Sequence, residues 1–226
     1  MFLESEKKFI AITQRLDNTN TYNEEREVLS TDWGIFFREY LSDFLMLPLS
    51  YACDITEYLP NISGVIFSGG NDLSLFSDNP LSQKRDKFEQ ELIESCMRDS
   101  IPILGICRGA QMIGSYFGSQ LTHCMNHTKP HVVFQNSMTK DSNKRDSTHS
   151  TIPKKTSFMV NSFHNYGIKK LGDALIGLAT SHDGFIEAFK HKKYPLFGIM
   201  WHIERKGGLE NTEIFDNFLT NIKEKK

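Results

Sequence analysis

The stretch PILGICRGAQMIGSYFG, residues 102–118, changes character at a single residue, Cys107. The residues before Cys107 are almost all apolar, as in a short buried strand, and those after it are spaced as in an amphipathic helix. Gly105 and Gly109 lie two positions to either side, which gives the G-x-C-x-G form of the nucleophile elbow. In such an elbow, small neighbours permit a strained strand-to-helix turn that exposes the nucleophile. The stretch therefore predicts a strand, a cysteine on a tight turn and a helix.

The same alternation of short apolar segments and helical segments continues on both sides of this stretch. It is typical of the α/β class, with a mostly parallel central sheet flanked by helices. Between residues 120 and 161 the pattern breaks into short β-like pieces, which predicts a small β-rich excursion in the second half. No internal repeat or linker divides the chain, so we expect residues 1–226 to form a single domain. The expected strands are 9–13, 45–50, 64–70, 102–107, 184–189 and 195–201, and the expected helices lie within 24–45, 83–99, 108–118 and 209–226.

Composition narrows the class of protein. The formal net charge is −2, which gives no general electrostatic reason to bind nucleic acid or an anionic membrane. Charged residues come before the first short apolar run, so we expect neither a signal peptide nor a membrane span, and a cytoplasmic location. The four cysteines are then expected to stay reduced. The oligomeric state, monomer or homodimer, stays open.

Cys107 is suited to nucleophilic chemistry. A helix that begins at Arg108 offers unpaired backbone N–H groups and the positive end of its dipole, and both favour the thiolate over the thiol. The N–H of Arg108 can also bind an oxyanion. The alternative is a buried cysteine that serves only as a small apolar side chain. The flanking glycines, the strand before and the helix after favour the nucleophile.

A cysteine nucleophile needs a general base, and His202 is the most informative of the eight histidines. It follows an apolar strand in LFGIMWHIERKGG, residues 196–208. If that strand is parallel to the one before Cys107, both side chains emerge at the same edge of the sheet. Glu204, two residues on, points the same way on an extended chain and could orient the imidazole. The alternatives are an ordinary strand-end histidine and a solvated carboxylate.

Three segments in order resemble the class I glutamine amidotransferase superfamily. GICRGAQMI (105–113) and GIMWHIE (198–204) are similar to its cysteine elbow and its W-H-x-E segment, and GVIFSGGNDLSLF (64–76) to its strand and SGG loop. The SGGNDL form and VNSFHNYGI (160–168) are most similar to the γ-glutamyl hydrolase branch, which includes γ-glutamyl-γ-aminobutyrate hydrolase. The resemblance implies a flavodoxin-like fold and needs neither metal nor cofactor. One departure is Ile203, where the family usually has proline between the histidine and the glutamate.

The resemblance implies hydrolysis of a γ-glutamyl amide to L-glutamate and an amine-bearing product. Cys107 would attack the γ-carbonyl, His202 would act as acid and base, and Glu204 would orient it. The backbone N–H groups of Gly70 and Arg108 would hold the oxyanion, since glycine lets backbone amides approach a ligand closely. Within this branch we consider γ-glutamyl-CDP-amidate, of capsular phosphoramidate synthesis, as a substrate that would release cytidine diphosphoramidate.

Substrate contacts are the least specific part of the interpretation. By resemblance, Gln111 and the NSFH segment with Asn161, Ser162 and His164 would bind the glutamyl unit. Each has an ordinary structural alternative, and so do Asn71 and Asp72, which turn chemistry explains equally well. We hypothesise that cationic residues meet the phosphates of a nucleotide-like leaving group, although solvated surface charge is the simpler interpretation. These cations are Arg205, Lys206, Arg15, Lys154 and Lys155.

Three other functions stay open. A glutaminase subunit would use the same chemistry to supply ammonia to a separate synthase. HCMNHTKPH, residues 123–131, could bind zinc through His123, Cys124, His127 and His131, but its spacing fits no standard finger; the resemblance makes it a pocket wall in which His131 faces the substrate. A non-catalytic binding module on the same fold would require an inactive triad.

Overall fold

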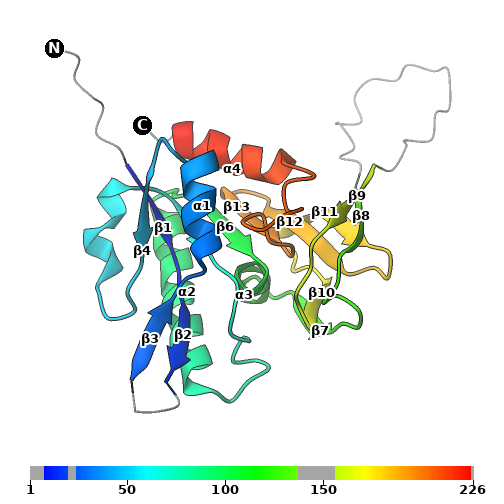
Figure 1. Ribbon diagram of the computed structural model, residues 1–226, viewed down its shortest axis with the longest axis horizontal. Coiled ribbons are helices and arrows are strands. Elements are labelled where there is room, and N and C mark those ends of the chain that lie inside the picture. The colour runs from blue at the N-terminus through cyan, green and yellow to red at the C-terminus, as the bar shows by residue number, and fades with distance from the viewer. Residues whose placement is uncertain (1–7, 20–23, 137–155, 225–226) are drawn as a thin grey trace.

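A computed structural model describes residues 8–19, 24–136 and 156–224 (Figure 1). Lys154 and Lys155, two of the cations hypothesised to meet a phosphate, lie outside the described residues. Among the described residues, eleven strands form one sheet and two more form a small separate sheet.

One half of the large sheet is parallel. The inner strands β5 (Ile62–Phe67), β6 (Ile103–Ile106) and β13 (Leu196–Ile199) are buried at every position, as expected where helices cover both faces, whereas the edge strand β4 (Leu45–Pro48) is not. Every pairing in this half is parallel. In spatial order the strands are β4 (Leu45–Pro48), β1 (Phe9–Ile12), β5 (Ile62–Phe67), β6 (Ile103–Ile106) and β13 (Leu196–Ile199).

The other half of the sheet is antiparallel and corresponds to the β-rich second half of the sequence. Its main path continues from β13, and a branch of two strands joins it at β12. The predicted fold class, a mostly parallel sheet flanked by helices with a β-rich part, is confirmed. The main path is β12 (Ile186–His191), β11 (Leu175–Ser181), β8 (His131–Gln135) and β9 (Ser157–Val160), and the branch is β10 (Tyr166–Lys170) and β7 (Gln120–His123).

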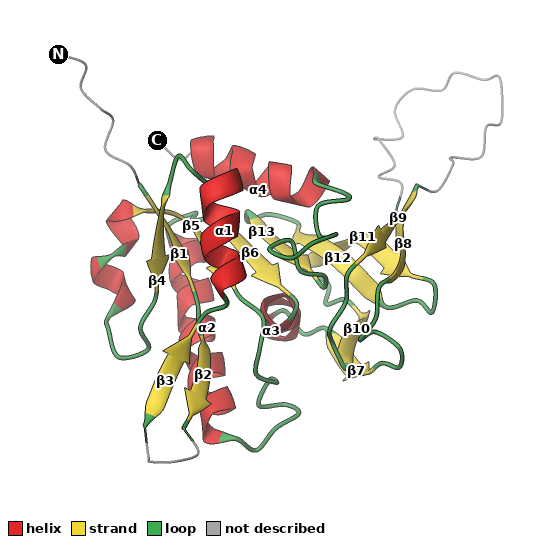
Figure 2. Cartoon of the chain, viewed as in Figure 1, coloured by secondary structure: helices red, strands yellow, loops and turns green. Residues whose placement is uncertain are grey.

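Helices cover the two faces of the parallel half (Figure 2). Apolar side chains of α1 (Thr31–Tyr40) and α4 (Glu213–Glu224) share one core cluster with Ile10 and Ile12 of β1. Those of α2 (Pro80–Arg98) and α3 (Arg108–Tyr116) share the other with Ala11. This division follows from the alternation of side chains along a strand. Two short 3₁₀ helices, η1 (Ile55–Glu57) and η2 (Leu59–Asn61), precede β5.

The prediction of a helix within residues 24–45 is partly wrong. Its first part is β3 (Glu25–Val28), which pairs antiparallel with β2 (Arg15–Asn18), and the helix begins only at α1. The side chains of residues 25–27 are exposed, so they supply no apolar stripe for a helix to bury. Ser30 marks the true start, because its hydroxyl accepts a hydrogen bond from the N–H of Asp32 as an N-cap.

Candidate active site

Cys107 occupies the strained turn that its flanking glycines predict. It directly follows β6 and has φ 52° and ψ −104°, a conformation that residues other than glycine rarely adopt. A Cβ added to Gly105 would lie 2.6 Å from the backbone of Gly109, and one added to Gly109 would lie 2.2 Å from the carbonyl oxygen of Phe67. The two glycines are therefore needed for helix α3 to pack closely against β5 and β6.

His202 and Glu204 follow β13, which runs parallel to β6, so they lie at the same edge of the sheet as Cys107. The Nδ1 of His202 is 2.6 Å from Oε1 of Glu204, and both side chains are buried. Burial alone would lower the pKa of His202, but contacts with the Cys107 thiol and the Glu204 carboxylate outweigh it and raise the pKa to about 9. This arrangement favours an imidazolium beside the cysteine at neutral pH.

Asn161 holds the segment that carries this pair. Its Oδ1 accepts a hydrogen bond from the N–H of His202 (2.8 Å), and its Nδ2 donates to the carbonyls of His202 (2.9 Å) and Lys206 (3.1 Å). Ile203, which stands where the family usually has proline, is buried in the core cluster. The hydrogen bonds of Asn161 and the burial of Ile203 keep the turn in place without a proline.

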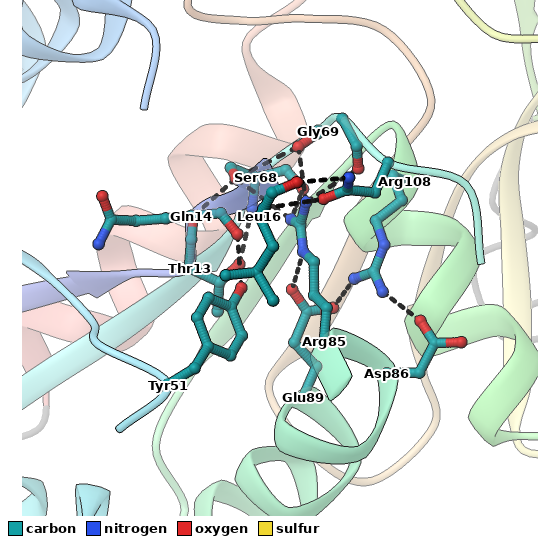
Figure 3. A network of polar contacts seen from close by, with 12 residues as sticks. Thr13, Gln14, Leu16, Tyr51, Ser68, Gly69, Arg85, Asp86, Glu89 and Arg108 are labelled. Carbon is teal, nitrogen blue, oxygen red and sulfur yellow. Dashed lines mark hydrogen bonds and ion pairs between the residues drawn. The ribbon is translucent and has the colours of Figure 1, made fainter. Parts of the chain in front are cut away.

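The SGG loop after β5 is fixed from behind by Arg85 of α2 (Figure 3). This guanidinium is fully buried and donates hydrogen bonds to the carbonyls of Ser68 (2.7 Å), Gly69 (3.1 Å) and Gly70 (2.9 Å). In a trans peptide the C=O and N–H point in opposite directions. The N–H of Gly70 therefore points away from Arg85, and Gly70 lines one cavity together with Cys107.

Arg108 lines the same cavity, and its guanidinium packs against α2. It forms ion pairs with Glu89 and Asp86 of α2 and is buried (Figure 3). Glu89 also accepts from Nε of Arg85 at 3.0 Å. Burial lowers the pKa of Arg108, and the neighbouring carboxylates act in the opposite direction. These ion pairs engage both terminal nitrogens of the guanidinium, and the role of the Arg108 backbone N–H toward an oxyanion stays a prediction.

Two cavities meet at the loop of Gly70. A cavity of about 250 Å³ contains Cys107, Gln111, His164 and Tyr166 in its wall. The other, of about 410 Å³, lies on the side of His202 and Glu204. It is lined by Arg15, Val28, Leu29, Ser30, Thr31, Trp33, Ser68, Gly69, Gly70, His202, Glu204 and Arg205.

The predicted contacts to the glutamyl unit are partly engaged in the fold. Gln111 lies in the cysteine cavity and donates to the carbonyl of Tyr166 (2.8 Å). Asn71 also lines it, but its amide bonds to both backbone groups of Leu16. Ser162 donates its hydroxyl to the carbonyl of His127 (2.5 Å) and is fully buried. Their roles toward substrate stay predictions.

The remaining predicted contacts divide between the two cavities. His164 lines the cysteine cavity, whereas Arg205 lines the larger one and packs its guanidinium over the ring of Phe163. The side chain of Lys206 is exposed and lines another cavity, together with Glu204 and Arg205. His131, expected to face substrate, lines a separate cavity with His127.

Sequence reasoning missed the positioning role of Arg85. It belongs to QKRDKFEQ, residues 83–90, where the charges look like a solvated helix face. The i,i+4 spacing of Arg85 and Glu89 is common on exposed helices and gives no sign of burial. The sequence predicts Asn161 only as a contact to substrate and not as the residue that holds the turn after β13.

Solved glutamine amidotransferases have this fold. One from Thermotoga maritima aligns with a TM-score of 0.61 at 18% identity, covering 97% of this chain and 84% of that one. The fold, with a cysteine elbow beside a histidine–glutamate pair, defines the glutamine amidotransferase-like class.

The chain belongs to the Peptidase C26 family, which matches residues 9–204. It is 48% identical to γ-glutamyl-CDP-amidate hydrolase of Campylobacter jejuni over 96% of this chain and 100% of that protein. It is 28% identical to a glutamine-hydrolysing GMP synthase subunit of Methanococcus vannielii, over 72% of this chain and 75% of that one. The family predicted from the three motifs is confirmed. No helix in the described ranges is long and apolar enough to cross a membrane.

Proposed function

We propose that the chain is a cysteine-dependent hydrolase of γ-glutamyl amides and that γ-glutamyl-CDP-amidate is its substrate. The observation that carries the proposal is the 48% identity, along the full length of the relative, to an enzyme named for that reaction. The proximity of an elbow cysteine to a histidine with a raised pKa supports the chemistry.

In the first half of the reaction, the thiolate of Cys107 attacks the γ-carbonyl carbon. The oxyanion accepts hydrogen bonds from the N–H groups of Gly70 and Arg108, each of which is worth about 100- to 1000-fold in rate in comparable sites. His202, as imidazolium, protonates the amide nitrogen while the C–N bond breaks. The amine-bearing product leaves, and the glutamyl group remains as a thioester on Cys107.

In the second half, neutral His202 takes a proton from water as the water attacks the thioester carbonyl. Collapse of that intermediate releases L-glutamate and restores the thiolate beside the imidazolium. Glu204 keeps the proton of His202 on Nδ1, so Nε2 is the nitrogen that exchanges protons in both halves.

The larger cavity suits the leaving group. Arg15 and Arg205 supply positive charge there, and Ser30 and Thr31 bring the N-terminal turn of α1. Guanidinium groups and helix N-termini both favour phosphate. The glutamyl unit would then occupy the cavity with Gln111 on the other side of the Gly70 loop.

The test is glutamate release from a panel of γ-glutamyl-CDP-amidate, γ-glutamyl-γ-aminobutyrate, γ-glutamyl peptides and glutamine. We expect one γ-glutamyl conjugate, the CDP-amidate, to be turned over far faster than glutamine, and Cys107→Ala to be inactive on all of them. Arg205→Ala should raise KM for the nucleotide-linked substrate alone. Equal turnover of all substrates, or activity in Cys107→Ala, would contradict the proposal.

A glutaminase subunit is the second candidate, and the match to a GMP synthase subunit favours it. It predicts slow hydrolysis of glutamine alone, with activity that rises when a separate synthase is added. The same panel distinguishes the two candidates.

A further inference from the structure

Three histidines converge on one buried carboxylate outside the candidate active site. Glu187 of β12 is fully buried, and its oxygens face His127, His131 and His164. The distances are 3.1 Å from Nδ1 of His127, 3.5 Å from Nε2 of His131 and 3.8 Å from Nε2 of His164. The four side chains come from the β7–β8 connection, β8, the β9–β10 connection and β12, which lie together at one side of the molecule (Figure 1).

None of these contacts has good hydrogen-bond geometry, although the groups attract each other: Glu187 raises the pKa of His127. Within the described part of the chain, the three facing nitrogens and both carboxylate oxygens are buried without a hydrogen-bond partner. Five such atoms in one place are unusual, because each unsatisfied buried polar atom is costly.

The second nitrogen of each ring explains why the facing nitrogen makes no hydrogen bond. It lies against an acceptor in every case, so it carries the ring proton, and the facing nitrogen of a neutral imidazole is a lone pair. When a ring is neutral, its lone pair faces the carboxylate, so a cation is needed between them, either a proton on the ring or a bound metal ion. The acceptors are the Asp183 carboxylate for His127 (3.1 Å), the Tyr166 carbonyl for His164 (3.0 Å) and the Lys129 carbonyl for His131 (3.3 Å).

We propose that His127, His131 and Glu187 bind a divalent transition-metal ion of the zinc type, with His164 beside the same carboxylate. Imidazole and carboxylate are ligands that zinc accepts, and metal–ligand bonds of about 2.0–2.2 Å in a tetrahedron separate the ligand atoms by about 3.3–3.5 Å. The contacts of His127 (3.1 Å) and His131 (3.5 Å) with Glu187 match this separation, whereas that of His164 (3.8 Å) is longer. A hydrogen bond from the outer nitrogen to a carboxylate or carbonyl, as all three rings make, is the usual support of a metal-bound histidine.

The ligand set differs from the zinc site considered for residues 123–131. His123 is exposed, and Glu187 and His164 come from segments far along the chain. His164 also lines the cavity of Cys107. Because His164 faces the same carboxylate, an ion bound to Glu187 would have a structural role and help to hold residues 163–166, which line that cavity.

The experiment measures metal content of the full chain, purified without a polyhistidine tag, by plasma mass spectrometry. We expect about one zinc-type ion per chain. Glu187→Gln should lose it, and His123→Gln, the matched control from the same histidine-rich stretch, should keep it. Asp183→Asn removes only the outer support of His127 and should weaken metal affinity on the order of 10- to 100-fold.

A second measurement keeps the test valid if Glu187→Gln does not fold. Wild-type protein stripped with a chelator should melt at a lower temperature, recover with Zn²⁺, and show a visible absorption band with Co²⁺. If stripped protein takes up neither ion, or if Glu187→Gln holds as much metal as His123→Gln, the inference is wrong and the histidines are an internal proton-sharing cluster. These readouts do not involve hydrolysis, so they are independent of the proposed function.

Discussion

Replacement of Glu204 by Gln should move the alkaline limit of activity to lower pH. His202 has a pKa of about 9 in place of 6.5, a difference that corresponds to about 3 kcal/mol of preference for its charged form in the folded chain. Glu204 is one of the two partners that raise this pKa, and the Cys107 thiol is the other. In Glu204→Gln the imidazolium therefore loses its proton at a lower pH.

The same pKa sets a dependence of stability on pH. Because the folded pKa lies above the unfolded one, the stabilisation is fully present below about pH 6.5 and is lost as the pH rises toward about 9. In Glu204→Gln the proton of His202 is no longer fixed on Nδ1, so kcat should also fall by about 100-fold or more. In Glu204→Gln the free energy of unfolding should decline less between these pH values, because one of the two contacts that raise the pKa of His202 is lost.

The assay is kcat/KM from pH 6 to 10 together with urea unfolding over the same range. The alkaline limb of the wild-type profile should lie near pH 9, and that of Glu204→Gln should lie about one pH unit lower or more. Glu210→Gln is the matched control, because Glu210 is an exposed carboxylate in the same loop. Superimposable limbs for Glu204→Gln and wild type would refute this account of His202.

Three further substitutions test the positioning of the site. In Gly69→Ala the new Cβ would lie 3.0 Å from Cε1 of His202, so kcat should fall about 10-fold, whereas Gly34→Ala, which meets nothing within 4 Å, should keep wild-type kcat. Arg85→Lys keeps the charge but loses the guanidinium hydrogen bonds to three loop carbonyls. The kcat should therefore fall about 10- to 100-fold with little change in KM. An unchanged kcat would show that the SGG loop keeps its conformation without Arg85. Asn161→Ala should lower the free energy of unfolding by about 2–4 kcal/mol in urea titrations, and a loss well below this range would mean that the turn after β13 is held by its core contacts.

Local sequence signals were enough to predict the parallel half of the fold and to bring the central residues of the candidate site to one edge of the sheet. The apolar runs before Cys107 and His202 predict two strands that end at one edge, and the structure has them as parallel neighbours. Glycine spacing predicts the strained turn, since the two close backbone approaches at Gly105 and Gly109 leave no room for a Cβ. Each of these signals spans only a few residues, which is why it could be found in one sequence.

The parts that could not be predicted depend on contacts between distant segments. Burial of Arg85 depends on the carbonyls of a loop 15 to 17 residues earlier, and nothing in its own helix indicates them. The histidines facing Glu187 lie on two connections and on β8, so only the folded chain brings them together. The β2–β3 pair was missed because its exposed residues have no apolar periodicity.

The buried ion pairs of α2 set limits on how sequences of this family can be recombined. One helix contacts the carbonyl side of the SGG loop through Arg85 and the elbow through the pairs of Asp86 and Glu89 with Arg108. A chimera with a crossover between residues 71 and 107 would combine a loop, a helix and an elbow whose four charges were not selected together. Functional crossovers should therefore lie outside this span, so that the segment from the loop to the elbow is inherited as one block.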